Sequence, residues 1–206
     1  MTHKRKMNEI KFIGRGGQGV VLSSQILGLA FFNAGLYPQC FSVFGGERRG
    51  APVISFLRVD REKILLKCGI RNPHEIVCLD AGLIDAGEIR SGLRPGGRIC
   101  INTDRPSEAF DALFSFTLAL VDARKISDAL DLGRVVNTAI LGAYWRMSQD
   151  LPLECLLSAI ETTIPSQKEG NLEAARRAYG AVRIYEPGND SPAGRSAPPG
   201  SKVQDG

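Results

Sequence analysis

A short alternation of apolar and polar residues opens the regular pattern of the chain. Residues 8–13 (NEIKFI) alternate closely enough to predict a first β-strand. A glycine cluster at 14–19 follows, and then an apolar run that continues to Asn33 and meets Gly35. That run is too long for a strand, and a glycine after it is a typical helix stop. The pattern therefore predicts a strand, a glycine turn and a helix, in that order.

Segments typical of strands and of helices alternate along the rest of the chain. The predicted strands are Tyr37–Phe44, Pro52–Val59, Lys63–Cys68, His74–Asp80, Arg98–Asn102 and Phe116–Val121. The predicted helices are Ile84–Ser91, Glu108–Phe114, Ala123–Leu130, Val135–Met147, Leu153–Thr163 and Gln167–Tyr179, the last ending at Gly180. We expect an α/β fold with a mixed, mostly parallel sheet and helices on both faces, in a Rossmann-like three-layer arrangement. Pro52–Val59 and Lys63–Cys68 should form an antiparallel hairpin, with residues 60–62 between them.

The length of 206 residues suits one domain. We expect a basic N-terminal end at residues 1–7, a single domain at 8–186 and a disordered tail at 187–206. The tail is rich in proline, glycine and serine and has almost nothing to bury. No internal repeat, secretory signal or membrane span is predicted.

Charge and reactive residues exclude several classes of function. The net charge of +4 is small, and part of it lies in the terminal run His3–Lys6, so nucleic-acid binding is not predicted. The five cysteines are never closer than ten positions, which argues against a metal site or an iron–sulfur cluster on this chain. An odd number of cysteines without a signal peptide indicates reduced thiols in a cytoplasm, packed as small core residues. Of the two histidines, His74 precedes a predicted strand and is expected at its entry, not as a general base.

Residues 16–46 carry no charged side chain at all. An amphipathic surface helix normally shows a charged face, so this segment should be covered on nearly all sides. Two interpretations remain: the rest of the domain covers this segment, or another subunit covers it.

The glycine cluster offers a candidate ligand site. Gly14, Gly16 and Gly19 satisfy GxGxxG between a predicted strand and helix, where backbone N–H groups favour an anion. NAD would also need an acidic residue at the end of the second strand, and residues 33–44 contain none. The pattern Gly16-Gly17-Gln18-Gly19 is also unusual for a dinucleotide fold. Two interpretations remain: an anionic ligand, or glycines required only for close packing of helix on strand.

A second candidate lies in the glycine-flanked loop Phe44–Pro52 (FGGERRGAP). Arginine suits planar, bidentate contacts with phosphate or carboxylate, so Arg48 or Arg49 could face a ligand or a partner. The alternative is a solvated turn.

Together these segments resemble the gamma subunit of the 2-oxoacid:acceptor oxidoreductases, the pyruvate:ferredoxin oxidoreductase family. The resemblance rests first on GRGGQGVVLSSQILGLA (Gly14–Ala30) and FGGERRGAPVISFLRVD (Phe44–Asp60). It continues through VCLD at 77–80, GGRICINT at 96–103, NTAILGA at 137–143 and the closing helix from 169 to 180. The motifs occur in one order over residues 9–184, which is far more specific than one glycine motif.

The resemblance implies a function that composition does not show. Such complexes convert a 2-oxoacid and CoA to an acyl-CoA and CO2, with electron transfer to ferredoxin or a similar acceptor. They are cytoplasmic hetero-oligomers of anaerobic metabolism. The partners implied are alpha, beta and ferredoxin-like delta subunits, with thiamine diphosphate and [4Fe-4S] clusters on those partners. This chain would contribute no catalytic residue and be inactive alone, supplying subunit packing and a surface for CoA.

Under this resemblance the cofactor-binding candidates are Gly14, Gly16, Gly17, Gln18, Gly19, Arg48, Arg49, Asn102 and Thr103. The second motif fits the pyruvate, 2-oxoglutarate or branched-chain types better than the indolepyruvate type, and aromatic substrates such as phenylglyoxylate stay open. The alternative function is a free-standing nucleotide- or anion-binding α/β module.

Overall fold

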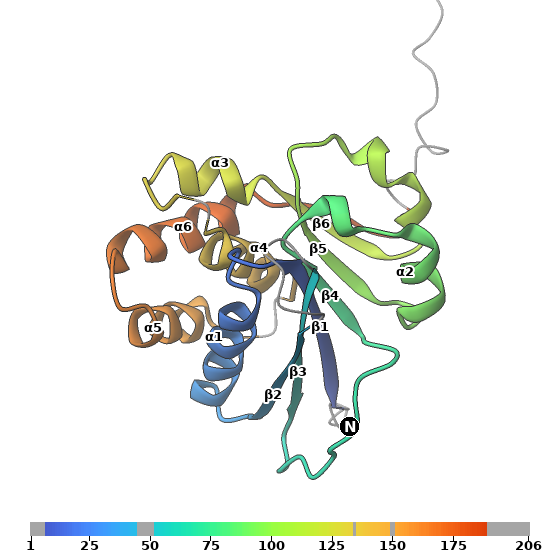
Figure 1. Cartoon of the computed structure of the whole chain (residues 1–206), viewed down its shortest axis with the longest axis horizontal. Helices are drawn as coiled ribbons and strands as arrows, with labels where there is room; N and C mark the ends of the chain where they lie inside the picture. The colour runs from blue at the N-terminus through green and yellow to red at the C-terminus, as the bar shows by residue number, and fades with distance from the viewer. Residues whose placement is uncertain (1–6, 45–51, 134, 149–150, 189–206) are drawn as a thin grey trace, which may run out of the picture.

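A computed structural model describes residues 7–44, 52–133, 135–148 and 151–188. Seven strands form one sheet in the order β2-β3-β1-β4-β5-β6-β7 (Figure 1). β1, β4, β5 and β6 are parallel neighbours, whereas β3 and β7 are antiparallel to the strands beside them. β2 is antiparallel to β3 and so runs with the central four, which confirms a mixed, mostly parallel sheet. The strands are β1 (Asn8–Arg15), β2 (Tyr37–Phe44), β3 (Pro52–Asp60), β4 (Glu75–Cys78), β5 (Arg98–Asn102), β6 (Thr117–Val121) and β7 (Arg183–Tyr185).

Helices cover both faces of this sheet, as expected for an α/β fold. One face carries α1, α3, α4, α5 and α6 over a large apolar core, and the other carries α2 and η2 over a smaller core on β4, β5 and β6 (Figure 1). The helices are α1 (Val20–Asn33), η1 (Ala81–Leu83), α2 (Ala86–Gly92), η2 (Ser107–Leu113), α3 (Ala123–Asp128), α4 (Asn137–Ser148), α5 (Leu153–Thr163) and α6 (Lys168–Ala181), where η1 and η2 are 3-10 helices.

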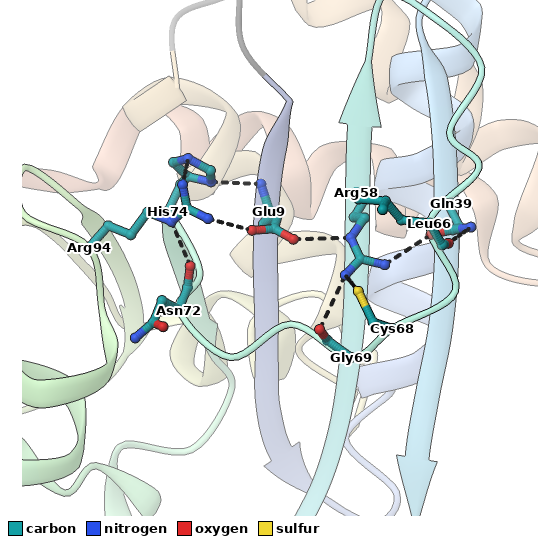
Figure 2. Close-up of polar contacts among 9 residues, drawn as sticks. All are labelled: Glu9, Gln39, Arg58, Leu66, Cys68, Gly69, Asn72, His74 and Arg94. Carbon is teal, nitrogen blue, oxygen red and sulfur yellow. Dashed lines mark hydrogen bonds and ion pairs between the residues drawn. The ribbon is translucent and has the colours of Figure 1, made fainter.

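The predicted strand Lys63–Cys68 is wrong, because residues 61–74 form no strand. This segment passes alongside the sheet instead. Side chains of β2 and β3 donate hydrogen bonds to its backbone carbonyls (Figure 2). The antiparallel hairpin therefore joins β2 to β3 rather than residues 52–59 to 63–68. The short strand β7 was not predicted, and α6 continues through Gly180 to Ala181. The proposed division into residues 1–7, 8–186 and 187–206 stays a prediction.

Internal packing accounts for the uncharged helix within residues 16–46. α1 lies between the sheet and α5, and only Gln25, Phe32 and Asn33 of its fourteen residues are exposed. Two serines make this packing possible, because the hydroxyls of Ser24 and Ser55 lie 2.7 Å apart inside the core. The rest of the domain is therefore the covering of α1.

The expectation that the cysteines pack as core residues is correct for two of the five. Cys78 and Cys100 are buried in neighbouring strands, whereas Cys40 and Cys68 are exposed and Cys155 is partly exposed. Burial raises the pKa of Cys78 to about 12, and it also raises the pKa of Cys100. In the described part of the chain, no group of three His, Cys, Asp or Glu side chains is placed to hold a metal ion. Within those same residues, no helix is long and apolar enough to cross a membrane.

We expect iodoacetamide at pH 8 to modify Cys68 in the native protein, and Cys78 only after denaturation. A pKa of about 12 instead of 9.0 lowers the thiolate fraction of Cys78 about a thousandfold, and burial blocks access as well. Peptide mass spectrometry after timed labelling gives the site of modification, and Cys68→Ser should abolish the product at position 68. Rapid native labelling of Cys78 would show that the β4–β5 region opens readily.

Candidate functional site at the carboxyl edge of the sheet

The glycine cluster connects β1 to α1. It lies where the connections that follow two neighbouring strands, β1 and β4, leave on opposite faces of the sheet. α1 follows β1 on one face of the sheet, and η1 and α2 follow the adjacent parallel strand β4 on the other (Figure 1). In open α/β sheets, ligands bind at the carboxyl ends of the strands near such a switch point. The predicted glycine turn therefore lies at the edge where this fold class forms ligand sites.

The glycines of the turn have different roles. Gly17 and Gly19 adopt φ values of 90° and 82°, a left-handed conformation that favours glycine. A Cβ on Gly14 would lie 2.6 Å from Cγ2 of Val20, so Gly14 permits close contact of strand and helix. The packing interpretation thus applies to Gly14, while Gly16 and Gly17 are exposed at the turn.

A carboxylate after β4 is tied to the turn. Asp80 Oδ2 accepts a hydrogen bond from Arg15 Nε at 2.8 Å and one from Gln18 Nε2 at 3.3 Å. Asp80 Oδ1 accepts from the backbone N–H of Gly82 at 2.9 Å. Gln18 also closes the turn on itself, because its Oε1 accepts from the N–H of Arg15 at 2.7 Å. These contacts fix the geometry of the glycine turn. They also occupy one backbone donor, the N–H of Arg15, which is bonded to Gln18.

A buried asparagine lies against the start of α1. The side chain of Asn137 is fully buried, and its Nδ2 would be 3.0 Å from a Cβ placed on Gly19. Its Oδ1 accepts from the N–H of Thr138 at 2.8 Å. Its Nδ2 has no hydrogen-bond partner within the described ranges. The first asparagine of the NTAILGA motif therefore packs on the glycine turn.

Asn102 is the last residue of β5 and Thr103 follows it, so both lie at the same edge. Asn102 Nδ2 donates to the carbonyl of Leu79 at 2.9 Å, and its Oδ1 accepts from the N–H of Ala123 at 3.0 Å. One amide thus connects the carboxyl ends of β4, β5 and β6. Thr103 Oγ1 accepts from the N–H of Arg105 at 3.0 Å and shapes the loop that follows. Asn102 is placed to position this edge more than to contact a ligand.

A cleft of about 580 Å³ opens across these strand ends. Its lining brings three of the predicted residues together: Gln18, Asn102 and Thr103. The remaining lining residues are Leu79, Asp80, Ala81, Gly82, Asp104, Arg105, Asp122, Arg124, Lys125, Asp128 and Val136. A second cleft of about 370 Å³ shares Thr103, Asp104, Arg105, Asp122 and Lys125 with the first and extends to Arg183 and Tyr185.

The charges of this edge differ in how far they are neutralised. Asp80 is paired with Arg15, and Asp128 is paired with Arg124 at 2.8 Å. Three cations, Arg105, Lys125 and Arg183, are exposed and make no ion pair with any residue that the structure describes. We call these three the cationic ridge. Asp104 and Asp122 line the same two clefts and also make no ion pair within the described residues, so carboxylates lie beside the ridge.

Sequence reasoning did not single out the ridge. The three residues are far apart in the sequence, and only the order β5-β6-β7 places them at neighbouring clefts. The one available signal was position, since Arg105 follows β5 closely and Lys125 follows β6 closely. Arg48 and Arg49 lie outside the described residues. The ends of the flanking strands are described, and Pro52 pairs with Arg15 at the carboxyl edge.

The chain is similar to known proteins over most of its length. The model of the family described as pyruvate ferredoxin/flavodoxin oxidoreductase matches residues 9–181. The common subunit gamma of the pyruvate/ketoisovalerate oxidoreductases of Thermococcus kodakarensis is 40% identical over 184 residues, which are 87% of this chain and 100% of that protein. Pyruvate synthase subunit PorC of Methanothermobacter thermautotrophicus is 40% identical over 176 residues, 84% of this chain and 94% of that protein.

Solved structures show the same fold. Pyruvate oxidoreductase subunit PORC from Thermotoga maritima superposes with a TM-score of 0.77 and 32% identity, covering 88% of this chain and 100% of that chain. A 2-oxoglutarate:ferredoxin oxidoreductase from Magnetococcus marinus, with 2-oxoglutarate, coenzyme A and succinyl-CoA bound, gives a TM-score of 0.69 at 18% identity. That match covers 85% of this chain and 31% of the Magnetococcus chain, where the same fold is part of a longer polypeptide.

Proposed function

The chain belongs to the pyruvate ferredoxin/flavodoxin oxidoreductase family, as a gamma subunit of a multi-subunit 2-oxoacid oxidoreductase, and from this premise we propose that it holds the phosphates of coenzyme A. In this proposal the chain supplies binding and packing, and the reaction occurs elsewhere in the complex. Thiamine diphosphate and iron–sulfur clusters belong to the alpha, beta and ferredoxin-like delta partners. Ferredoxin or a similar acceptor takes the electrons, and the complex acts in the cytoplasm.

The observation that supports this role is the cationic ridge between two clefts at the carboxyl edge. Coenzyme A carries a pyrophosphate and a ribose phosphate, so its nucleotide end bears several negative charges. Arginine and lysine bind phosphates by charge-assisted hydrogen bonds, and arginine can do so in a bidentate manner. Arg105 and Lys125 line both clefts, so one phosphate-bearing ligand could contact them from either side. Gln18 of the glycine turn lines the first cleft, and its sequence neighbours Gly16 and Gly17 are exposed.

Other groups at this edge position the site. Asn102 fixes three strand ends, and Asp122 Oδ1 accepts from the N–H of Lys125 at 2.8 Å, which orients the start of α3. The Arg15–Asp80 pair holds the glycine turn against the end of β4. Coenzyme A, when bound, supplies the thiol that accepts the acyl group.

We expect Arg105→Ala and Lys125→Ala each to raise the Michaelis constant for CoA in the assembled complex. Loss of one charge-assisted bond of roughly 1.5–3 kcal/mol corresponds to about a ten- to hundredfold change. The constant for the 2-oxoacid should stay within about twofold, because that substrate reacts on other chains. Arg90→Ala is the matched control, since Arg90 is an exposed arginine of α2, away from both clefts. An unchanged CoA constant in both ridge variants would contradict this role.

The Michaelis constant for CoA should also be measured for Arg48→Ala and Arg49→Ala. If either arginine contacts a CoA phosphate, we expect the CoA constant to rise by a similar factor, about ten- to hundredfold. If the pair contacts a neighbouring subunit instead, the subunits should fail to co-purify while any surviving complex keeps its CoA constant. CoA saturation and subunit stoichiometry, measured on the same preparations, distinguish these outcomes.

A further inference from the structure

The second of the two clefts at the carboxyl edge lies where the sheet ends in β6 and β7. It has a volume of about 370 Å³ and is lined by residues of the loop after β5, of β6, of α3, of the end of α6 and of β7. β7 is antiparallel to β6, so its first residue, Arg183, lies at the carboxyl edge, opposite Leu120. No described residue of the glycine turn lines this cleft. The motifs of the sequence therefore leave most of its lining without a role.

Part of the lining of the second cleft is apolar and includes an aromatic ring. Tyr185 of β7 is partly buried, and its ring makes an edge-to-face contact with Phe114, with ring centroids 5.8 Å apart and an interplanar angle of 84°. Pro106, Leu120 and Ile126 line the same cleft. A planar heterocycle suits such a lining, because its faces are apolar and stack on an aromatic ring.

Side chains of both charges line the second cleft. Arg105, Lys125 and Arg183 make no ion pair with any described residue, and neither do Asp104 and Asp122. A small inorganic anion would be attracted by the cations and repelled by the carboxylates. A ligand that joins phosphates to hydroxyl and amino groups satisfies both, because its phosphates pair with the cations and its N–H and O–H groups donate to the carboxylates.

The end of α6 adds further hydrogen-bond acceptors. α6 ends at Ala181, which lines the second cleft. The last carbonyl groups of a helix have no partner within the helix and need donors from elsewhere. The exocyclic amino group of an adenine is such a donor. The second cleft thus combines an aromatic ring, cations and acceptors, which are the groups that bind a nucleotide.

We propose that the second cleft holds the adenosine end of coenzyme A and that Arg183 binds its ribose phosphate. Adenine stacks on Tyr185, and the pyrophosphate lies at Arg105 and Lys125, which line both clefts. The pyrophosphate and the ribose phosphate of CoA are attached to one ribose, so their sites must be neighbours, and all three cations line one cleft. This inference rests on the proposed CoA role. It adds the orientation of the ligand and the residue that distinguishes CoA from dephospho-CoA.

Dephospho-CoA, which lacks only the ribose phosphate, tests the role of Arg183. In the assembled complex we expect its Michaelis constant to exceed that of CoA by about ten- to hundredfold, the effect of one charge-assisted bond. Arg183→Ala should raise the constant for CoA by a similar factor and leave the constant for dephospho-CoA within about twofold. Arg90→Ala is the matched control and should leave the ratio of the two constants unchanged. An equal rise of both constants in Arg183→Ala, or no rise of either, would overturn the assignment of Arg183.

The other two cations keep this inference separate from the CoA role itself. Arg105→Ala and Lys125→Ala act on the pyrophosphate, which both ligands carry, so both constants should rise together. If they rise while Arg183→Ala leaves the ratio unchanged, the chain binds CoA in another orientation, and only the present inference fails. If neither variant changes either constant, the CoA role fails as well.

Equilibrium binding of adenosine 3′,5′-bisphosphate, the nucleotide end of CoA, tests the stacking without turnover. In the assembled complex, Tyr185→Leu should weaken binding of this nucleotide about tenfold or more, because the aromatic face is lost while apolar volume is kept. Tyr185→Phe keeps the ring and should bind the nucleotide within about twofold of the unchanged protein. Inorganic phosphate should compete poorly, since it offers nothing to the base site. Equal affinity of the two variants, or equally strong competition by inorganic phosphate, would contradict this placement of the adenosine.

Discussion

Arg58→Met should lower the free energy of unfolding by about 3–5 kcal/mol, the usual cost of removing one member of a buried ion pair. Arg58 is 1% exposed, and its only carboxylate partner in the described chain is Glu9, at 3.0 Å. Methionine fills similar space but leaves Gln39 Oε1 and the carbonyl of Gly69 without this donor. Chemical denaturation followed by circular dichroism measures the loss.

Arg58→Met should also make residues 61–72 more mobile in the native state, before the whole protein unfolds. Without Arg58, residues 68–69 lose their attachment to the sheet, so native-state hydrogen exchange should rise over 61–72 and stay unchanged in α4. Arg177→Met is the matched control: it removes an exposed ion pair with Glu173, which is even shorter at 2.8 Å but worth less than about 1 kcal/mol. The double variant Arg58→Met/Glu9→Gln should be less destabilised than the sum of its single changes. Equal stability of the two arginine variants would contradict a structural role for Arg58.

Gly142→Ala should destabilise the fold by about 3 kcal/mol, the upper part of the range for overpacking. A Cβ on Gly142 would lie 2.0 Å from the carbonyl oxygen of Ala175 and 2.7 Å from its carbonyl carbon. Both are backbone atoms of α6, so α4 and α6 must move apart to accept one methyl group. This cost exceeds the gain of about 1 kcal/mol that alanine normally brings to a helix interior. The melting temperature should fall by roughly 6–12 °C.

Gly180→Ala is the control for this substitution. Gly180 is also within a helix, and a Cβ there meets no atom within 4 Å. We therefore expect Gly180→Ala to raise stability by up to about 1 kcal/mol. If Gly142→Ala and Gly180→Ala change the melting temperature in the same direction, the close crossing of α4 and α6 does not exist in solution.

Periodicity along the chain was sufficient for most of the fold. The predicted bounds of Tyr37–Phe44, Arg98–Asn102 and Leu153–Thr163 agree with β2, β5 and α5 residue for residue. These segments have clear apolar patterns, and a proline, glycine or polar residue lies within two positions of each end. Local pattern and tertiary environment favour the same structure there, so neither overrides the other.

Local pattern failed where structure depends on distant partners. Lys63–Cys68 has an apolar centre but pairs with no strand of the described sheet, and it is held by side chains of other strands, Arg58 of β3 and Gln39 of β2. β7 is only three residues long and pairs with β6 across more than 60 intervening residues, so no local signal predicts it. Both errors arise from sheet order, which periodicity does not determine.

The candidate site was predictable to a similar extent. Motifs brought Gln18, Asn102 and Thr103 to one cleft, because each follows a parallel strand and such strands end at one edge. The role of Asn102 was not predictable, since its two amide bonds go to the ends of other strands. The cationic ridge depends on β5, β6 and β7 being neighbours, so the positions of its basic residues along the chain do not predict it.

The most direct test of the central claim is CoA-dependent oxidation of 2-oxoacids by complexes with and without this chain. The subunits should be co-expressed, purified through a tag on a partner and assayed with an artificial electron acceptor, with the isolated chain assayed in parallel. We predict no turnover by the chain alone, and loss of CoA-dependent turnover when it is omitted from the complex. Turnover by the isolated chain, or full activity of a complex that lacks it, would contradict its assignment as a gamma subunit that serves the reaction through binding and packing.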